Sequence, residues 1–208
     1  MTESRPRRLG VVLFPEFELL DVFGPLEMFG MLKDAVDIVV VAERKGPVTS
    51  AQGPQVVAHH DFDDAPRLDL ILVPGGFGTR GEAENPRMLD FLARRAGDAE
   101  VVMSVCTGTA LLACAGLLDG KRATTNKMFF GWVAGQRPQV EWVKEARWVE
   151  DGKLVTSSGV SAGIDMSLAV IARLFGPQMS ENLAVAAEYD WHRDSTWDPF
   201  ARIHGLVS

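Results

Sequence analysis

The stretch that decides the fold is EVVMSVCTGTALLACAGLL, residues 100–118. Its first part predicts a buried strand over 100–105, and its second part predicts a helix over 107–118. Cys106 stands between the two. A strand that turns directly into a helix lifts the residue at the turn out of the sheet, as in a nucleophile elbow. The stretch therefore predicts an α/β sheet with a thiol at a strand end.

The same alternation runs through most of the chain. Apolar runs predict further buried strands over 9–14, 36–41 and 68–74, and helical patterns predict helices over 19–32, 85–97, 161–176 and 177–190. We expect hairpins within 44–66 and 146–159, the second turning at Asp151–Gly152. This order predicts a doubly wound α/β sandwich with a mostly parallel central sheet. We expect one domain over 1–208, with a flexible tail at 1–8 and an irregular, aromatic segment at 191–208 that packs on the domain or on a partner.

Composition excludes several classes of protein. Among 208 residues, 21 Lys and Arg stand against 28 Asp and Glu, and the formal charge of −7 does not suit binding to nucleic acid. No apolar run approaches the roughly 20 residues that span a bilayer. Two cysteines do not make a disulfide framework, so we expect a cytoplasmic protein with free thiols. We expect His59 and His60 in a solvated loop and predict no metal site.

The position of Cys106 gives a physical reason for reactivity. Ligands bind beyond the carboxyl ends of strands in an open parallel sheet. The helix that follows has unpaired N–H groups, which predicts a stabilised thiolate and a lowered thiol pKa. A buried, inert cysteine is the alternative, and position alone does not decide between them. For Cys114, within the helical pattern, we expect the inert state.

Two other strand ends carry features that complement a thiol. Gly75 and Gly76 follow the strand over 68–74, and their amides, with that of Thr107, could stabilise developing negative charge. Asp21 follows the first strand among apolar neighbours. Residue pattern alone favours a helix cap there, and the alternative is a crevice carboxyl with a raised pKa. Glu27, six residues on, could equally be a surface helix residue.

Four motifs together resemble the ThiJ/PfpI superfamily. They are DVFGPLE (21–27), PGG (74–76), SVCTGTALLACAGLLDGKRATTN (104–126) and SSGVSAGIDMSLAVIARLFG (157–176), in family order. The resemblance implies a flavodoxin-like sandwich with a nucleophile elbow, and it is closest to the isocyanide hydratase-like branch and to the sensor domains of AraC-type regulators. The regulators continue into a helix-turn-helix segment, whereas this sequence stops at Ser208, so a self-contained transcription factor is not expected.

The resemblance implies roles for particular residues. Cys106 takes the nucleophile position, Asp21 the proton-transfer position, and Thr107 orients Asp21 or water. The substrate or its developing charge would be bound by Gly75, Gly76, Phe77 and Val160. Phe23 is a further candidate for the wall of the substrate pocket. The protease-like branch has His directly after Cys, so Thr107 does not fit peptide hydrolysis. Asn126 stands where the family often has His, and it cannot titrate.

The implied activity is the addition of water to an isocyanide through a cysteine thioimidate, giving an N-formamide without a cofactor. We expect a small-molecule substrate and a homodimer. One alternative is a cysteine-based sensor of oxidative stress or a binding protein. Another is a glyoxalase-type enzyme acting on α-oxoaldehydes, which Asp in place of Glu at position 21 and the missing His disfavour.

Overall fold

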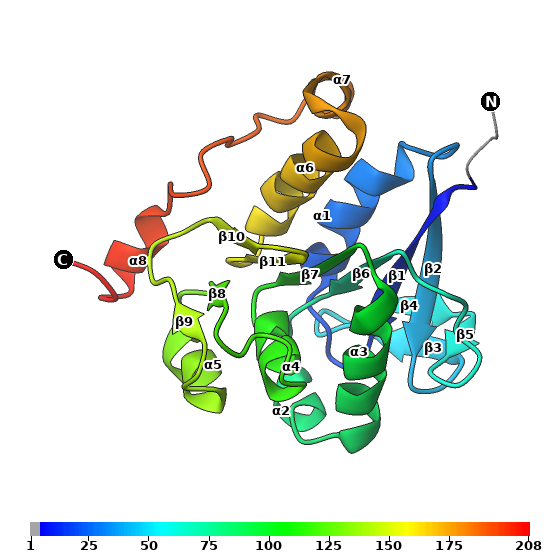
Figure 1. Cartoon of the computed structure of the whole chain (residues 1–208), viewed down its shortest axis with the longest axis horizontal. Helices are drawn as coiled ribbons and strands as arrows, with labels where there is room; N and C mark the ends of the chain where they lie inside the picture. The colour runs from blue at the N-terminus through cyan, green and yellow to red at the C-terminus, as the bar shows by residue number, and fades with distance from the viewer. Residues whose placement is uncertain (1–4) are drawn as a thin grey trace.

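A seven-stranded sheet lies at the centre of the computed structural model, which describes residues 5–208 (Figure 1). Its strands, in spatial order, are β10 (Trp148–Asp151), β11 (Leu154–Ser157), β7 (Val101–Val105), β6 (Leu70–Val73), β1 (Arg7–Leu13), β2 (Val36–Ala42) and β5 (His60–Asp61). Neighbouring strands are parallel except β10 and β11, which form an antiparallel hairpin at one edge. The predicted α/β fold with a mostly parallel sheet is confirmed.

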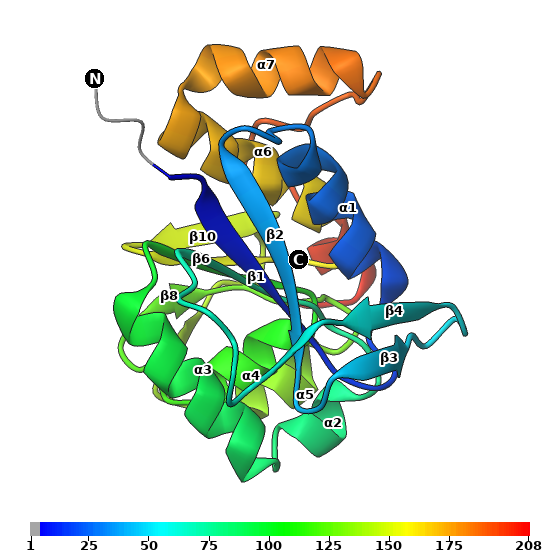
Figure 2. The ribbon, with the colours of Figure 1, turned by 90° about the vertical axis from the view of Figure 1, so that its right-hand side faces the viewer.

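Helices cover both faces of the sheet (Figure 2). One face carries α1 (Leu19–Gly30) and α6 (Ala162–Phe175), with α7 (Pro177–Ala186) packed on α6. The other face carries α2 (Thr79–Glu82), α3 (Pro86–Asp98), α4 (Gly108–Cys114) and α5 (Phe130–Gln136). Two further two-stranded sheets are not hydrogen-bonded to the central one. They are β3 (Gly46–Thr49) with β4 (Gln55–Ala58), and β8 (Arg122–Ala123) with β9 (Glu141–Trp142). The last helix is α8 (Pro199–Ile203).

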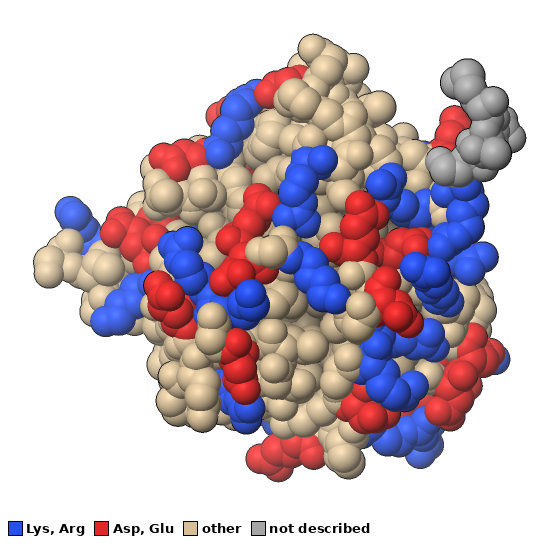
Figure 3. All heavy atoms as spheres, viewed as in Figure 1, with Lys and Arg blue, Asp and Glu red and all other residues tan. Residues whose placement is uncertain are grey.

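The continuous apolar runs become the middle of the core. Every residue of β6 and β7 is buried, as strands covered on both faces require. Figure 3 shows charges of both signs interspersed over one face of the molecule. Within residues 5–208, none of the helices combines the length and apolar character needed to cross a bilayer.

Several segments differ from the expectations. The flexible tail expected at 1–8 is too long, because β1 begins at Arg7 and the Arg5 guanidinium bonds Asp69; residues 1–4 lie outside the described part. His60, expected in a loop, belongs to the edge strand β5. Helix α4 ends at Cys114, short of residue 118, because the chain turns through a positive φ of 75° at Gly116.

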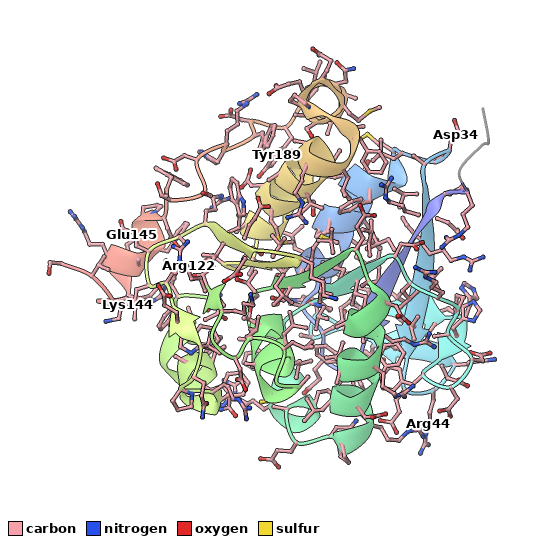
Figure 4. All side chains as sticks on the ribbon, in the orientation of Figure 1. Asp34, Arg44, Arg122, Lys144, Glu145 and Tyr189 are labelled. Carbon is pink, nitrogen blue, oxygen red and sulfur yellow. The ribbon has the colours of Figure 1, made fainter. Side chains whose placement is uncertain are left out.

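The segment 191–208, expected to be irregular, contains α8 and is tied to the domain by buried groups. The Arg147 guanidinium and the Asp165 carboxylate form an ion pair whose side chains are 6% and 0% exposed. Asp165 Oδ1 also accepts bonds from the Tyr189 hydroxyl at 3.1 Å and from the His192 N–H at 3.0 Å. Burial and the charge of Asp165 raise the pKa of Tyr189 to about 12. Tyr189 lies where α7 gives way to this segment (Figure 4).

Arg147→Met should lower the free energy of unfolding by about 3 kcal/mol or more, because it leaves the buried Asp165 carboxylate without its cation. Chemical denaturation measures the change. The matched control is Arg173→Met, which removes a partly exposed pair with Glu150 and should cost less than about 1 kcal/mol. Equal losses in the two variants would contradict the assignment.

Candidate active site

The carboxyl ends of four neighbouring parallel strands lie on the same side of the sheet, and the predicted site lies beyond them. In spatial order they are β11, β7, β6 and β1. The segments that follow them hold, in the same order, 158–160, 106–107, 75–77 and 15–21. The topology therefore brings together residues that are far apart in the sequence.

Cys106 sits on a strained turn between β7 and α4. Its φ of +58° lies in the left-handed region, which residues other than glycine rarely adopt. The Cys106 carbonyl accepts a bond from the Thr125 hydroxyl at 2.7 Å, which helps to hold the turn. At Gly108 a Cβ would lie 2.4 Å from the Val73 carbonyl oxygen, so only glycine lets α4 begin this close to β6. The resulting turn has the geometry of a nucleophile elbow.

Asp21 lies in the first turn of α1 and is completely buried. Its Oδ2 accepts a bond from the Gly75 N–H at 2.8 Å. Its Oδ1 is also buried and has no hydrogen-bond partner of normal geometry among residues 5–208. The helix-cap interpretation is wrong, because the N-cap residue is Glu18 and Asp21 makes no capping bond. The carboxyl instead faces the interior of the site.

The thiol and the carboxyl form a coupled, buried pair. Desolvation raises the pKa of Asp21 well above its usual value, and hydrogen bonding, chiefly with the Gly75 N–H and less with the thiol, opposes this only in part. Desolvation and the charge of Asp21 raise the pKa of Cys106, while bonds from the Thr107 amide and hydroxyl lower it. The predicted lowering of the thiol pKa is therefore wrong, because burial outweighs the donors at the start of α4. The two groups resist being charged together, so the pair retains at least one proton at neutral pH.

The glycine amides are used inside the site. Gly75 N–H bonds Asp21, and Gly76 N–H bonds the Thr107 hydroxyl at 3.0 Å. Both differ from the predicted role of stabilising charge on a substrate, because neither amide is free. A Cβ on Gly75 would lie 2.7 Å from the Thr107 nitrogen and hydroxyl oxygen and 2.8 Å from Asp21 Oδ2. Glycine at this position allows the carboxyl and Thr107 to come together.

A cavity of about 170 Å³ opens onto the thiol. Its lining consists of Glu18, Gly76, Phe77, Arg80, Cys106, Thr107, Asn126, Met128, Phe129 and Val160. The predicted wall residues Phe77 and Val160 are among them, but Phe23 is not. The Phe77 and Phe129 rings meet edge to face, 6.2 Å apart. The Arg80 guanidinium lies 5.0 to 5.6 Å from the Phe77, Phe129 and Trp132 ring centroids and supports this aromatic wall.

Several lining residues carry no signal in the sequence. Glu18, Arg80, Met128 and Phe129 lie in turns and short helices without a recognisable period. Among the lining residues without an assigned role in the sequence analysis, only Asn126 carries a signal, because the family often has His at this position. Of the tail histidines, His192 stacks on Trp197, and His204 lines an adjoining cavity of about 320 Å³ that shares Asn126, Met128 and Val160 with the first. Glu27 is exposed, and no set of three His, Cys, Asp or Glu side chains within 5–208 is arranged to hold a metal ion.

Comparisons with known proteins agree with this geometry. The DJ-1/PfpI family model matches residues 7–173. An isonitrile hydratase of Pseudomonas putida is 39% identical over 184 residues, which are 88% of this chain and 78% of that protein. The transcriptional regulator CdhR of Pseudomonas aeruginosa is 31% identical, over 68% of this chain and 41% of its own length. The crystal structure of a ThiJ/PfpI family protein from Pseudomonas syringae superposes with a TM-score of 0.83 at 33% identity, covering 91% of this chain and 78% of that one.

Asp21→Asn should raise the free energy of unfolding at pH 7.5 by more than about 1 kcal/mol. The folded-state pKa of Asp21 is raised above its usual value of 3.8. The contribution of this carboxyl to the free energy of unfolding is therefore full below pH 3.8. It is lost as pH rises through the folded pKa. Asn avoids this loss, and the gain should shrink at pH 4.

Urea denaturation at the two pH values measures the difference. The control is Asp34→Asn, an exposed site before β2 and so at the opposite end of the sheet (Figure 4). A variant that is less stable than the wild type at pH 7.5 would show that the carboxyl is not desolvated.

Gly159→Ala should block the thiol, because the added Cβ would lie 2.8 Å from Cys106 Sγ. We expect alkylation of Cys106 by iodoacetamide to slow about 10²-fold, with the circular dichroism spectrum retained. Gly131→Ala is the control, since its Cβ meets no atom within 4 Å. Unchanged alkylation in Gly159→Ala would place the thiol elsewhere.

Proposed function

This chain belongs to the DJ-1/PfpI family, and from that starting point we propose that it is an isocyanide hydratase-like enzyme. Such an enzyme adds water to an isocyanide and releases an N-formamide. The observation that carries the proposal is an elbow cysteine that faces a small, mostly apolar cavity with a buried carboxyl behind it. The Pseudomonas putida relative, whose name uses the synonym isonitrile, supports the same reaction.

In the first step the sulfur of Cys106 attacks the terminal carbon of the isocyanide. A carbon–sulfur bond forms, and the carbon must gain a proton to give the thioimidate R–N=CH–S–Cys. The thiol and Asp21 hold that proton between them, because both groups resist ionisation when buried together. Asp21 returns the proton to carbon as the general acid. Its Oδ1, which has no hydrogen-bond partner within residues 5–208, is the oxygen suited to this transfer.

In the second step a water molecule attacks the thioimidate carbon. The oxygen bonds to carbon, the nitrogen takes up one of the water protons, and the carbon–sulfur bond breaks with its electron pair on sulfur. The products are R–NH–CHO and the regenerated thiol, so atoms and protons balance. Asp21 serves here as the base that accepts and passes on the proton of water. Thr107, whose amide and hydroxyl lower the pKa of Cys106, favours the departure of the sulfur as an anion.

The cavity suits an isocyanide because isocyanides are weakly polar and carry no charge. Phe77, Phe129, Met128 and Val160 supply apolar contacts for the R group. The volume of about 170 Å³ favours a compact R group, such as a small ring. The expected homodimer and cytoplasmic setting remain predictions.

The site fits the two alternatives less well. Redox-sensing cysteines have accessible thiols with a low pKa, whereas Cys106 is only 6% exposed and burial raises its pKa. The family resemblance for a glyoxalase expects Glu and His, where this chain has Asp21 and Asn126. The hydratase is therefore the function that the site supports best.

Incubation with cyclohexyl isocyanide should produce N-cyclohexylformamide, measured by mass spectrometry. Cys106→Ala should lower kcat at least about 10³-fold, because it removes the nucleophile. Asp21→Asn should have a loss of similar size, since Asn cannot move a proton. The control is Cys114→Ala, which removes the other cysteine, half-buried at the end of α4, and should keep full activity.

A wild-type protein that releases no formamide would contradict the proposed reaction. Formamide release that survives Cys106→Ala would instead retain the reaction and rule out the thioimidate.

A further inference from the structure

The side chain of Asn126 presents a free hydrogen-bond donor beside the thiol. Its Oδ1 accepts the Phe129 N–H at 3.1 Å, and because only an oxygen can accept that bond, Nδ2 is the other end of the amide. A Cβ on Gly159 would lie 2.6 Å from Nδ2 and 2.8 Å from Cys106 Sγ. The two atoms therefore border the same small space. Within residues 5–208, no acceptor takes a hydrogen bond from Nδ2.

The backbone on both sides of Asn126 is fixed. Before it, the buried Thr125 bonds the Cys106 carbonyl through its hydroxyl. After it, the Lys127 ammonium is only 3% exposed; it bonds the Thr125 carbonyl at 3.2 Å and pairs with Asp198 at 3.0 Å. A buried ion pair of this kind fixes the position of both residues, because neither partner can move without leaving the other charge buried and unpaired. Asn126 is thus pre-organised to meet a bound molecule rather than to close a gap in the fold.

We propose that Asn126 is a catalytic residue that donates a hydrogen bond from Nδ2 to the group attached to the Cys106 sulfur. In the proposed reaction, on which this inference rests, the acceptor is the nitrogen of the thioimidate. As water adds to the carbon, the electron pair of the C=N bond moves onto this nitrogen before a proton reaches it. A donor already aimed at the nitrogen stabilises that charge without reorganising. Asn126 acts on the second step, the hydrolysis.

An amide suits this position because it does not titrate. Cys106 and Asp21 already share a proton. A cation or an anion at position 126 would change which of the two groups holds it. The Asn126 amide donates at every pH without adding charge. The donor is therefore available whichever of the two groups holds the proton.

The test separates formation of the thioimidate from its hydrolysis in cyclohexyl isocyanide turnover. Asn126→Ala should leave formation nearly unchanged and slow hydrolysis about 10²-fold, the typical cost of losing one such donor. Intact-mass spectra taken during turnover should then show the chain plus one isocyanide as the main species. Asn182→Ala, an exposed amide on α7, is the matched control and should show no accumulated adduct.

Asn126→His provides a readout that a purely structural role would not move. Below its pKa of about 6.5 the imidazolium is a charged and therefore stronger donor than the neutral ring, so the rate of hydrolysis should acquire a new pH limb near that value. The wild type should lack this limb. A His variant with the wild-type pH profile, or an Ala variant with wild-type kcat and no adduct, would overturn the role of Asn126 and leave the hydratase proposal intact.

A second arm does not depend on isocyanide turnover. Asn126→Asp places a carboxylate toward the sulfur, which raises the pKa of the thiol, and iodoacetamide alkylation at pH 8 should slow about tenfold. Asn182→Asp adds the same charge far from the cavity and should not. If the wild type forms no formamide, the hydratase proposal fails, and this arm alone decides whether Asn126 serves the group on the sulfur. Wild-type alkylation rates in Asn126→Asp would then overturn the inference.

Discussion

The site depends on one buried carboxyl. Asp21 lies inside the domain, where desolvation opposes its charge, and the Gly75 N–H donates a backbone hydrogen bond to it. That bond forms only because three strand ends converge and position 75 has no side chain to keep them apart. The same closeness places Thr107 against both the carboxyl and the thiol. The carboxyl, the thiol and the turn are thus one packed unit, and the protonation states of the carboxyl and the thiol depend on each other.

Local patterns in the sequence predict the framework of this unit. The parallel strands are readable because they are buried on both faces and their apolar runs are continuous. The place of Cys106 is readable because a strand pattern and a helix pattern meet on it. The burial of Asp21 cannot be predicted in this way, because its hydrogen-bond partner Gly75 lies 54 residues away in the sequence. Without knowledge of burial, the dipole of the following helix suggests a low thiol pKa, whereas desolvation reverses the direction.

The wall of the cavity lies beyond the reach of such patterns for a different reason. Phe77 belongs to a turn and Arg80 to the four-residue helix α2. Asn126, Met128 and Phe129 belong to a loop between short elements. Segments this short show no period of 2 or 3.6, so nothing in their spacing says which side chain turns inward. Tertiary contacts decide instead, above all the buried contacts of Thr125 and Lys127.

The anchoring of Lys127 by Asp198 bears on when the protein becomes competent during synthesis. Asp198 lies 71 positions after Lys127 in the sequence, so the ribosome adds it later. Strand β7, which leads to the thiol, and helix α1, which holds the carboxyl, are complete well before this. Until α8 docks, the ammonium of Lys127 lacks the carboxylate of Asp198, and its solvation opposes burial. The nascent domain therefore reaches its finished cavity only after the segment that holds Asp198 and α8 is free to fold back.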